Sequence, residues 1–469
     1  MTSHFLNDRK LVHLQTVINP EAMASRFIEH FQIHQSRSDF EIEKCAIEKI
    51  YYRPGKSCGV LYRLIFHNDN GKQSDHWFFG RMYPPGRGYS HYEVASSQTN
   101  DAPASNHSGE NLPGFIKEPV HFLPELDMVL WTFPFDPKMP GLQQSADPAF
   151  VKQQIDHHLP AFGLTTGWQA ERIDCRRIKY MPGKRCVLRY QVRMAGPSGE
   201  SRDVIFYSKT YHDGKSQYHF NILQTAYAQL RTQAAIVGIP RPLLHFESAN
   251  TFWQEEWQGK PLLEVLEEYD GQQLFEKIAT LLAALHRSQL DLLCRAPDPD
   301  DILKTATEDG LEFIHVLPEY RQRLETLLEH LAAAKARFEQ HDFPAVPIHG
   351  AIRLEQMLVR GEELALVDFD ALALGDPLAD VAEFIASLHY LELSCGLSRD
   401  FLTKAADWFY DSYAQQVPWP CDRRRVAWYV LAFGISKIFL SLKNLNVRAL
   451  QQLDSAGQEI INHWLALLD

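Results

Sequence analysis

VPIHGAIRLEQMLVRGEELALVDFDALALGDPLADVA, from Val346 to Ala382, is the stretch that decides the fold of this chain. A polar loop at His349 to Gln356 leads into a predicted β-hairpin, whose second arm, Leu364 to Val367, delivers Asp368 and Asp370. Two carboxylates at the end of an apolar strand suit a hard cation such as Mg²⁺, which takes one or two carboxylates plus phosphate oxygens. Because ordinary turns also follow strands, the pair alone leaves a metal site and a plain turn open.

The composition is that of an ordinary globular protein of two or three domains, with 469 residues, 45% hydrophobic and 23% charged. A net charge of −12 argues against a general binder of nucleic acid, which needs clustered Lys and Arg. The seven cysteines contain no CxxC pair, so reduced thiols and a cytoplasmic location are expected. No signal peptide is visible, and the most apolar run, Val426 to Leu442, is short and carries Lys437, which favours a core helix over a membrane span.

The first half of the chain contains an internal duplication. Tyr180 to Cys186 repeats Tyr52 to Cys58, and the offset of 128 holds without a gap through Gly86 and Gly214. Each copy predicts a hairpin, because Pro-Gly suits the central positions of a type II turn. The copies are then expected to differ, with a helix over 217–236 in the second and a loop over 91–111 in the first. The identities are Tyr52/Tyr180, Pro54/Pro182, Gly55/Gly183, Lys56/Lys184, Cys58/Cys186, Tyr62/Tyr190, Gly71/Gly199, Phe78/Phe206, Tyr83/Tyr211 and Gly86/Gly214.

Strands come first and helices last, which predicts a segregated α+β architecture. Residues 1–40 read as helix, and each copy ends in a further strand, Met128 to Phe133 and Thr251 to Trp257. From Pro261 onward the pattern is helical, apart from the hairpin after His349. The expected helices are Leu262 to Glu268, Gln273 to Arg287, Glu319 to Gln340, Ala379 to Leu393, Ser398 to Gln415, Arg423 to Asn444 and Ala449 to Leu468.

In this order the elements resemble the aminoglycoside phosphotransferase and choline kinase-like family of the protein-kinase-like fold. The resemblance covers about Glu171 to Asp469. It implies a bilobal fold, with a small antiparallel β lobe over 151–259 and a large helical lobe over 260–469. Residues 1–150 are then a second, degenerate copy of the β lobe. The motifs that carry the resemblance are Leu282 to His286 (LAALH), His349-Gly350, Val367 to Asp370 (VDFD) and Gly375 to Ala382 (GDPLADVA).

The resemblance also implies a site for ATP and Mg²⁺. Lys209, on the strand Val204 to Tyr211, would reach the α- and β-phosphates, and the turn Pro182 to Arg185 would cover them. A solvated lysine and a plain hairpin turn are the alternatives that the residues alone leave open. The remaining implied contacts are Lys184 or Arg185 beside the phosphates, backbone groups of Glu256 and Trp257 for adenine, Asp368 for Mg²⁺, Asp380 as a residue that fixes the loop, and His286 as a packed core histidine.

Three departures from the family pattern affect catalysis. Such kinases read His-Gly-Asp in the catalytic loop, but Ala351 stands where the aspartate would accept the substrate's hydroxyl proton. The loop ends on Gln356 instead of the metal-holding asparagine, and its extra methylene would shift the metal. The predicted helix 217–236 has no Asp or Glu to hold Lys209. The nearest substitutes are Gln224 and Gln229 for that carboxylate, Glu355 as a displaced base and Arg353 as a phosphate clamp, and the last two also read as solvated loop residues.

We therefore expect a nucleotide-binding protein with impaired phosphotransferase activity, a pseudokinase, because loss of a general base costs roughly 10² to 10⁴ in rate. Two alternatives stay open: an active kinase of a small hydroxylated metabolite bound between the helices of 290–341 and Ala351, and a nucleotide-free scaffold. The first copy carries Arg81 where the second has Lys209. Residues 1–150 are therefore expected to form a structural or protein-binding module, and neither nucleic acid nor membrane is expected as a partner.

Overall fold

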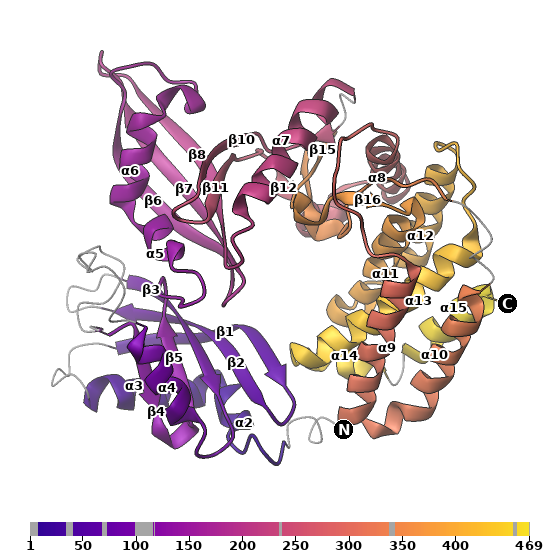
Figure 1. Ribbon diagram of the computed structural model, residues 1–469, viewed down its shortest axis with the longest axis horizontal. Helices are drawn as coiled ribbons and strands as arrows, with labels where there is room; N and C mark the ends of the chain where they lie inside the picture. The colour runs from indigo at the N-terminus through magenta and orange to yellow at the C-terminus, as the bar shows by residue number, and fades with distance from the viewer. Residues whose placement is uncertain are drawn as a thin grey trace. The chain divides into compact units, whose positions relative to one another are not determined.

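The computed structural model describes residues 8–33, 41–67, 73–98, 116, 118–233, 237–336, 343–453 and 457–468. Its helices and antiparallel sheets confirm the predicted α+β class (Figure 1). The chain divides into two compact units. Unit 1 holds Met1–Gln217, Leu243–Glu255 and Lys443–Leu445, and unit 2 holds Tyr218–Pro242, Glu256–Leu442 and Asn446–Asp469. Both large sheets therefore lie in unit 1, and most of the helices lie in unit 2.

The first sheet of unit 1 has five antiparallel strands in the order β1-β2-β3-β5-β4. The predicted hairpin joins β1 to β2, and Gly55 in its turn has a φ of +62°, as position i+2 of a type II turn requires. The sequence also predicts a turn at Asn68 to Gly71, which lies outside the described residues. The elements are α2 (Leu14–Val17), α3 (Pro20–Ile33), β1 (Glu41–Arg53), β2 (Ser57–His67), β3 (Gln73–Met82), β4 (Val120–Leu123) and β5 (Met128–Thr132).

The second sheet has the order β10-β11-β8-β7-β6, which from its other edge repeats the connectivity of the first. Buried contacts repeat as well: the Tyr62 hydroxyl donates to Val17 O at 2.6 Å, and the Tyr190 hydroxyl donates to Ser145 O at 2.5 Å, each partner being 128 residues further along. The duplication itself stays a prediction, with which this repeated arrangement agrees. The elements are α5 (Gly141–Ala146), α6 (Pro148–His157), β6 (Gln169–Met181), β7 (Arg185–Ala195), β8 (Ser201–Tyr211), β10 (Pro242–Phe246) and β11 (Thr251–Glu255).

Both copies carry a helix after their third strand, so the prediction of a loop over 91–111 is wrong for its first part. α4 (Gly88–Ser97) follows β3 as α7 (Ser216–Gln233) follows β8. Asp127 Oδ1 accepts hydrogen bonds from Gly86 N and Gly88 N at 3.0 and 3.1 Å, and Asn250 Oδ1 accepts one from Ser216 N at 3.2 Å. A helix start that is held from a distant turn leaves no mark in the local composition. Residues 99–111 lie outside the described part of the chain.

One hydrophobic core runs through both sheets of unit 1. At the junction, Arg177 Nη2 donates to the Asp75 carbonyl at 2.9 Å, and the guanidinium carbon lies 5.3 and 5.0 Å from the ring centroids of Trp77 and Phe133. The first sheet is therefore packed against the second and shares its core. The shared core includes Leu61, Phe79, Val129 and Trp131 from the first sheet, and Tyr180, Leu188, Tyr190, Phe206 and Trp253 from the second.

Unit 2 consists of helices and two small sheets, of order β12-β14-β15-β9 and β13-β16. The predicted hairpin of the opening stretch is confirmed as the antiparallel pair of β14 and β15. The strands are β9 (Val237–Gly238), β12 (Lys260–Pro261), β13 (Val346–Ile348), β14 (Met357–Arg360), β15 (Glu363–Leu366) and β16 (Ala373–Gly375). The helices are α7, which belongs to this unit from Tyr218 onward, α8 (Gly271–His286), α9 (Pro299–Val316), α10 (Arg321–Lys335), α11 (Pro377–Cys395), α12 (Arg399–Ala414), α13 (Arg423–Lys443), α14 (Val447–Gln452) and α15 (Gln458–Leu468). Short 3-10 helices lie at Pro124–Leu126, Leu159–Phe162, Leu262–Glu268, Pro318–Tyr320, Leu354–Gln356 and Phe369–Ala371.

Four helices of unit 2 differ from the sequence-based expectation. The helical pattern places no helix over α9, and it joins α14 and α15 into one, whereas the structure ends α14 at Gln452 and begins α15 at Gln458. The segment Leu262–Glu268 is a 3-10 helix with a kink at Val265. Among the described residues one helix, α13, has the length and hydropathy of a membrane span, and 61% of that apolar window is buried among its neighbours. The expected core helix is therefore present there.

Candidate functional site

A buried carboxylate holds the loop that follows β13. Asp380, in the first turn of α11, accepts hydrogen bonds from His349 N to Oδ2 at 2.6 Å and from Gly350 N to Oδ1 at 2.8 Å, and it is 1% exposed. Gly350 has a φ of +75°, and a Cβ there would lie 2.5 Å from Ala371 O, so that only glycine fits. The expected role of Asp380 in fixing the loop is confirmed by these contacts.

His286, at the end of α8, supports Asp380 from the core. Its Nδ1 lies 2.7 Å from the Tyr413 hydroxyl, and its Nε2 lies 3.2 Å from Asp380 Oδ2. Because the Asp380 carboxylate can only accept, Nε2 carries the proton, and in the neutral ring Nδ1 accepts a hydrogen bond from the Tyr413 hydroxyl. The Nε2–H of His286 then donates to Asp380. His286 is a packed core histidine, as expected, and acts on the loop only through Asp380.

Asp368 and Gln356 lie together at the end of the β14–β15 hairpin. Val367 N donates to Gln356 O at 3.0 Å, and Gln356 Nε2 lies 3.5 Å from Asp368 Oδ2. Asp368 has a φ of +68°, a conformation that non-glycine residues rarely adopt outside tight turns and functional sites. Gln356 is 5% exposed. The two side chains fit one Mg²⁺ through the carboxylate and, after an amide flip, the amide oxygen, with phosphates as further ligands. Among the described residues, no three His, Cys, Asp or Glu side chains group as metal ligands.

The loop offers little acid–base chemistry between these two supports. Ala351 is half-buried, so a methyl group stands at the position of the missing aspartate. Glu355 is exposed on the 3-10 helix Leu354–Gln356. Arg353 is half-buried, and its Nε is buried without a hydrogen-bond partner among the described residues. Because an unsatisfied buried donor is costly, Arg353 is the loop cation best suited to receive an anion.

Lys209 lies on β8 in unit 1, whereas Ala351, Gln356 and Asp368 lie in unit 2. Lys209 pairs with Val187 on one side and Phe252 on the other, and it is 7% exposed. Two residues along the strand, Tyr207 pairs with Arg189. Because side chains two apart in a strand share a face, this face of the sheet carries an ammonium, a phenol and a guanidinium. On α7, Gln224 is exposed and Gln229 is half-buried.

The equivalent face of the first sheet is filled with aromatic rings. A Cβ on Gly59 would lie 2.8 Å from Phe79 Cζ, and the Phe79 and Trp131 rings stack with centroids 5.7 Å apart. Arg81, the counterpart of Lys209, has its guanidinium carbon 5.2 Å from the Phe79 centroid. Leu61, Phe79, Val129 and Trp131 of this face belong to the shared core.

The turn of the second hairpin is held by Asp136, a residue that sequence reasoning missed. Asp136 Oδ2 accepts hydrogen bonds from Gly183 N at 2.7 Å and from the Tyr180 hydroxyl at 2.9 Å. Lys184 is exposed, and Arg185 is half-buried at the start of β7. The sequence signal was available: Asp136-Pro137-Lys138 lies 128 residues after Asp8-Arg9-Lys10.

Trp257 closes the segment that follows β11. Its indole fills the space beside Gly238 and Gly259, where an added Cβ would lie 2.7 and 2.2 Å from ring atoms. The guanidinium carbon of Arg360 lies 4.9 Å from the ring centroid. Glu256 is half-buried beside it. Because these side chains are packed, the groups that the segment can offer to a ligand are its backbone N–H and C=O groups.

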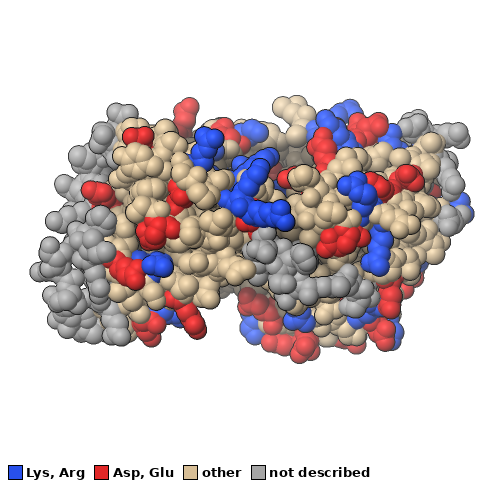
Figure 2. All heavy atoms as spheres, turned by 90° about the horizontal axis from the view of Figure 1, so that it is seen from below, with Lys and Arg blue, Asp and Glu red and all other residues tan. Residues whose placement is uncertain are grey.

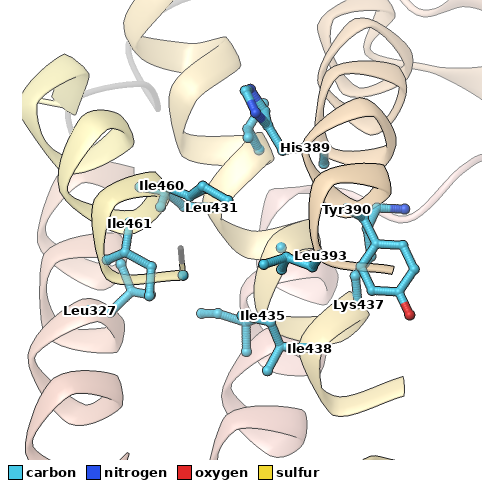
Figure 3. Close-up of a pocket in the computed structure, with 14 residues that line it drawn as sticks. Leu327, His389, Tyr390, Leu393, Leu431, Ile435, Lys437, Ile438, Ile460 and Ile461 are labelled. Carbon is cyan, nitrogen blue, oxygen red and sulfur yellow. The ribbon is translucent and has the colours of Figure 1, made fainter. Parts of the chain in front are cut away.

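An apolar cavity of unit 2 lies away from the loop at His349 to Gln356. It has a volume of about 50 Å³, and Lys437 at its edge donates to Glu383 at 2.7 Å. Figure 3 shows Leu327 of α10, His389, Tyr390 and Leu393 of α11, Leu431, Ile435, Lys437 and Ile438 of α13, and Ile460 and Ile461 of α15 around it. On the face drawn in Figure 2, acidic and basic side chains of the described residues are interspersed. The expectation that nucleic acid is not a partner stays a prediction.

Residues 216–414 match the model of a family described as the phosphotransferase enzyme family. The resemblance to aminoglycoside phosphotransferases and choline kinase-like proteins, predicted from the motifs, is thereby confirmed for this part of the chain. No curated protein matches the sequence.

Solved structures similar to the chain include aminoglycoside phosphotransferase APH(3'')-Id from Streptomyces rimosus, at 18% identity over 61% of this chain and 98% of that one, with a TM-score of 0.36. A choline/ethanolamine kinase family protein from Mesorhizobium loti is 14% identical over 70% and 97%, with a TM-score of 0.40. Spectinomycin phosphotransferase APH(9)-Ia, solved with ADP and spectinomycin, is 12% identical over 69% and 96%, with a TM-score of 0.42. Because the identities and TM-scores are this low, these likenesses identify no substrate for this chain.

Proposed function

We propose that this protein binds ATP with Mg²⁺ and is a weak or inactive phosphotransferase. The observation that carries the proposal is the loop of unit 2. Its support is intact, because Asp380 holds both His349 N and Gly350 N, while Ala351 removes the proton acceptor. Burying a carboxylate costs free energy unless it is well hydrogen-bonded. The presence of this buried support therefore favours a loop that still has a function.

The proposal assigns the binding contacts to each unit separately. In unit 2, Asp368 and Gln356 hold Mg²⁺, which neutralises phosphate charge when bound. In unit 1, Lys209 contacts the phosphates, with Lys184 or Arg185 of the Pro-Gly turn beside them. Backbone groups of Glu256 and Trp257 are assigned to adenine, and the packing of Trp257 against Gly238 supports a fixed backbone there. The remaining proposed attributes are a cytoplasmic location, and neither nucleic acid nor membrane as a ligand.

The impaired activity follows from the side chains that remain. A general base contributes roughly 10² to 10⁴ in rate, and a methyl group cannot supply it. Glu355 is exposed and Gln356 is neutral, so neither restores the aspartate in place. The role of residues 1–150 in this proposal is structural, because their sheet shares a core with the second sheet. A protein partner on that module is the alternative role.

One observation favours a second candidate, an active kinase for a small hydroxylated metabolite. The buried Nε of Arg353, which has no hydrogen-bond partner in the described part of the chain, lies two residues after Ala351 and would suit a transferring phosphoryl group. In this alternative, Arg353 clamps the phosphate and Glu355 takes the proton. Release of ADP over a panel of hydroxylated metabolites tests it, and turnover that disappears in Asp368→Ala but persists in the parent protein would establish the kinase.

Thermal denaturation with ATP and MgCl₂ tests the nucleotide proposal directly. A ligand that binds only the native state raises stability by about 2.7 kcal/mol at 100 times its Kd. The melting temperature of the parent protein should therefore rise with millimolar MgATP, and this rise should be lost in Asp368→Ala. Asp400→Ala, an exposed carboxylate on α12, is the matched control. A melting temperature that MgATP leaves unchanged would contradict the proposal and favour the nucleotide-free scaffold.

A further inference from the structure

Asp136 and Asp8 share three hydrogen bonds in the two copies, and Asp8 Oδ1 accepts a fourth from Leu11 N at 3.2 Å. Asp8 Oδ2 accepts hydrogen bonds from Gly55 N at 2.6 Å and the Tyr52 hydroxyl at 3.0 Å, as Asp136 Oδ2 does from Gly183 N and the Tyr180 hydroxyl. The second oxygen of each aspartate accepts the backbone N–H two residues on, Lys10 and Lys138, at 2.9 Å in both. Each Pro-Gly turn is therefore tied to a segment 44 residues before its tyrosine.

The aspartate accepts from a backbone N–H that the turn itself leaves without a hydrogen bond. The backbone closes each turn through Lys56 N to Arg53 O at 3.0 Å and Lys184 N to Met181 O at 2.9 Å, which leaves the glycine N–H outside the turn's own hydrogen bond. A backbone donor without a partner is costly when it is shielded from water. The aspartate supplies that partner, so it fixes the orientation of the peptide bond between proline and glycine.

Of the two aspartates, Asp136 is the more deeply buried. Asp136 is 5% exposed, whereas Asp8 is half-buried. Burial, together with the charge of Asp136, raises the pKa of Tyr180 well above its usual range, so this hydroxyl stays a donor at neutral pH. The stem of Lys138 covers the turn, because a Cβ on Gly183 would lie 3.1 Å from Lys138 Cδ. If this buried carboxylate left the turn, the hydrogen bonds from Gly183 N and the Tyr180 hydroxyl would be lost together.

The connector that carries Asp136 is anchored in the shared core. Phe133 N donates to Trp77 O at 2.9 Å, and the Phe133 ring meets Tyr180 edge to face with centroids 5.4 Å apart. Phe135 and Met139, on either side of Asp136, are buried in the same core. The first sheet thus fixes the connector, and the connector fixes the turn of the second sheet.

We propose that Asp136 is a positioning residue that holds the Pro182–Arg185 turn in its nucleotide-binding shape, so that residues 1–140 act on the phosphate contacts through this carboxylate. The inference rests on the proposed nucleotide binding. A turn that is already ordered loses less conformational entropy when the ligand binds, and this favours affinity. Asp8, which makes the same contacts on a turn to which no ligand is assigned, provides the internal comparison.

The test compares Asp136→Ala with Asp8→Ala in the full-length protein. Both variants lose the hydrogen bonds to the turn's glycine N–H and tyrosine hydroxyl, and both should lower the melting temperature. Only Asp136→Ala should weaken MgATP binding in calorimetric titration, by about tenfold, which is the effect of 1.4 kcal/mol. Tyr180→Phe and Tyr52→Phe, which remove only one hydroxyl, serve as milder variants in case the alanine variants do not fold. Equal MgATP affinity in Asp136→Ala and the parent protein would show that the carboxylate is merely structural.

Amide hydrogen exchange without nucleotide separates this inference from the proposed function. The Gly183 amide should exchange faster in Asp136→Ala than in the parent protein, and the Gly55 amide should do so only in Asp8→Ala. If the parent protein fails to bind MgATP, the proposed function fails and the positioning role for nucleotide fails with it. Faster exchange at Gly183 would then still establish the clamp itself, whereas unchanged exchange would overturn the clamp.

Discussion

Asp380 Oδ2 lies 2.6 Å from His349 N, and Asp380 and His349 are both almost completely buried. Asp380→Asn would place an amide where two backbone N–H groups and the Nε2–H of His286 now donate. Because an unsatisfied buried donor costs about 1–3 kcal/mol, we expect a loss of about 3 kcal/mol in the free energy of unfolding, measured in urea. Asp400→Asn, exposed in the first turn of α12, should change it by less than about 1 kcal/mol. Equal effects of the two substitutions would contradict the supporting role of Asp380.

Gly434 in α13 borders the apolar cavity, and a Cβ there would meet no atom within 4 Å. Gly434→Ala should therefore stabilise the protein by about 1 kcal/mol, because alanine favours the helix and the methyl group enters open space. The control is Gly310→Ala in α9, where the Cβ would lie 3.2 Å from Leu328 Cδ1 and the gain should be smaller. Thermal denaturation of both variants measures the difference. A destabilised Gly434→Ala would show that the space is not available.

His389, on α11, should make the stability of the protein depend on pH. Burial, and then the nearby charges of His463 and Arg399, lower its pKa from 6.5 to about 4. The native state therefore binds fewer protons than the unfolded state between these values, so this contribution is complete above about pH 6.5 and is lost as the pH falls toward 4. Linkage puts the loss at about 3 kcal/mol.

His389→Leu should remove this part of the pH dependence. Urea unfolding between pH 4 and 7 would show a parent-minus-variant difference that changes over that window. His330→Gln, at an exposed histidine of α10, should leave the slope as it is in the parent protein. A constant difference between the parent and His389→Leu across the window would mean that His389 titrates normally.

Arg177 joins the two sheets of unit 1, with its side chain 18% exposed between Trp77 and Phe133. Arg177→Ala should cost about 2 kcal/mol, because it removes a hydrogen bond to the Asp75 carbonyl and two cation–π contacts. The neighbouring Arg176 is exposed, and Arg176→Ala should be nearly neutral. Denaturant unfolding followed by tryptophan fluorescence compares them. If both were neutral, the junction would not depend on the guanidinium.

Ala351→Asp restores the proton acceptor on a loop whose backbone support is already present. If the proposed function holds, ADP release with a suitable hydroxylated acceptor should rise by about 10²-fold or more. Ala351→Asn has nearly the same shape and no proton-accepting carboxylate, so it should stay at the parent rate. Coupled measurement of ADP over the acceptor panel gives both values. Equal rates in the two variants would indicate that more than the base is missing.

The sequence predicts those features that depend on local signals. Pro54-Gly55 and Pro182-Gly183 predict their hairpins, and the apolar run before Asp368 predicts strand β15 of the β14–β15 hairpin. The start of α9 also has a local signal, because Asp298 directly precedes Pro299 and caps the helix by accepting a hydrogen bond from Asp301 N at 3.0 Å. α9 is absent from the predicted helices because Gly310 and several acidic residues interrupt its apolar face.

Other features depend on partners that lie far along the chain. α4 is held by Asp127, 39 residues after Gly88. Asp136 meets Tyr180 across 44 residues, and Arg177 meets Asp75 across 102. No local composition encodes such pairs. For the same reason the sequence could name Asp368 and Gln356 through a family pattern, but not the 3.5 Å contact between them.

The connector from Phe133 to Pro140 is not a tether between two separable lobes. Its aromatic and methionine side chains belong to the shared core, and its aspartate belongs to the next hairpin. A proteolytic cut there would therefore damage both sheets at once, and neither piece would keep a complete hydrophobic interior. The two sheets of this chain thus form one compact unit with one hydrophobic core.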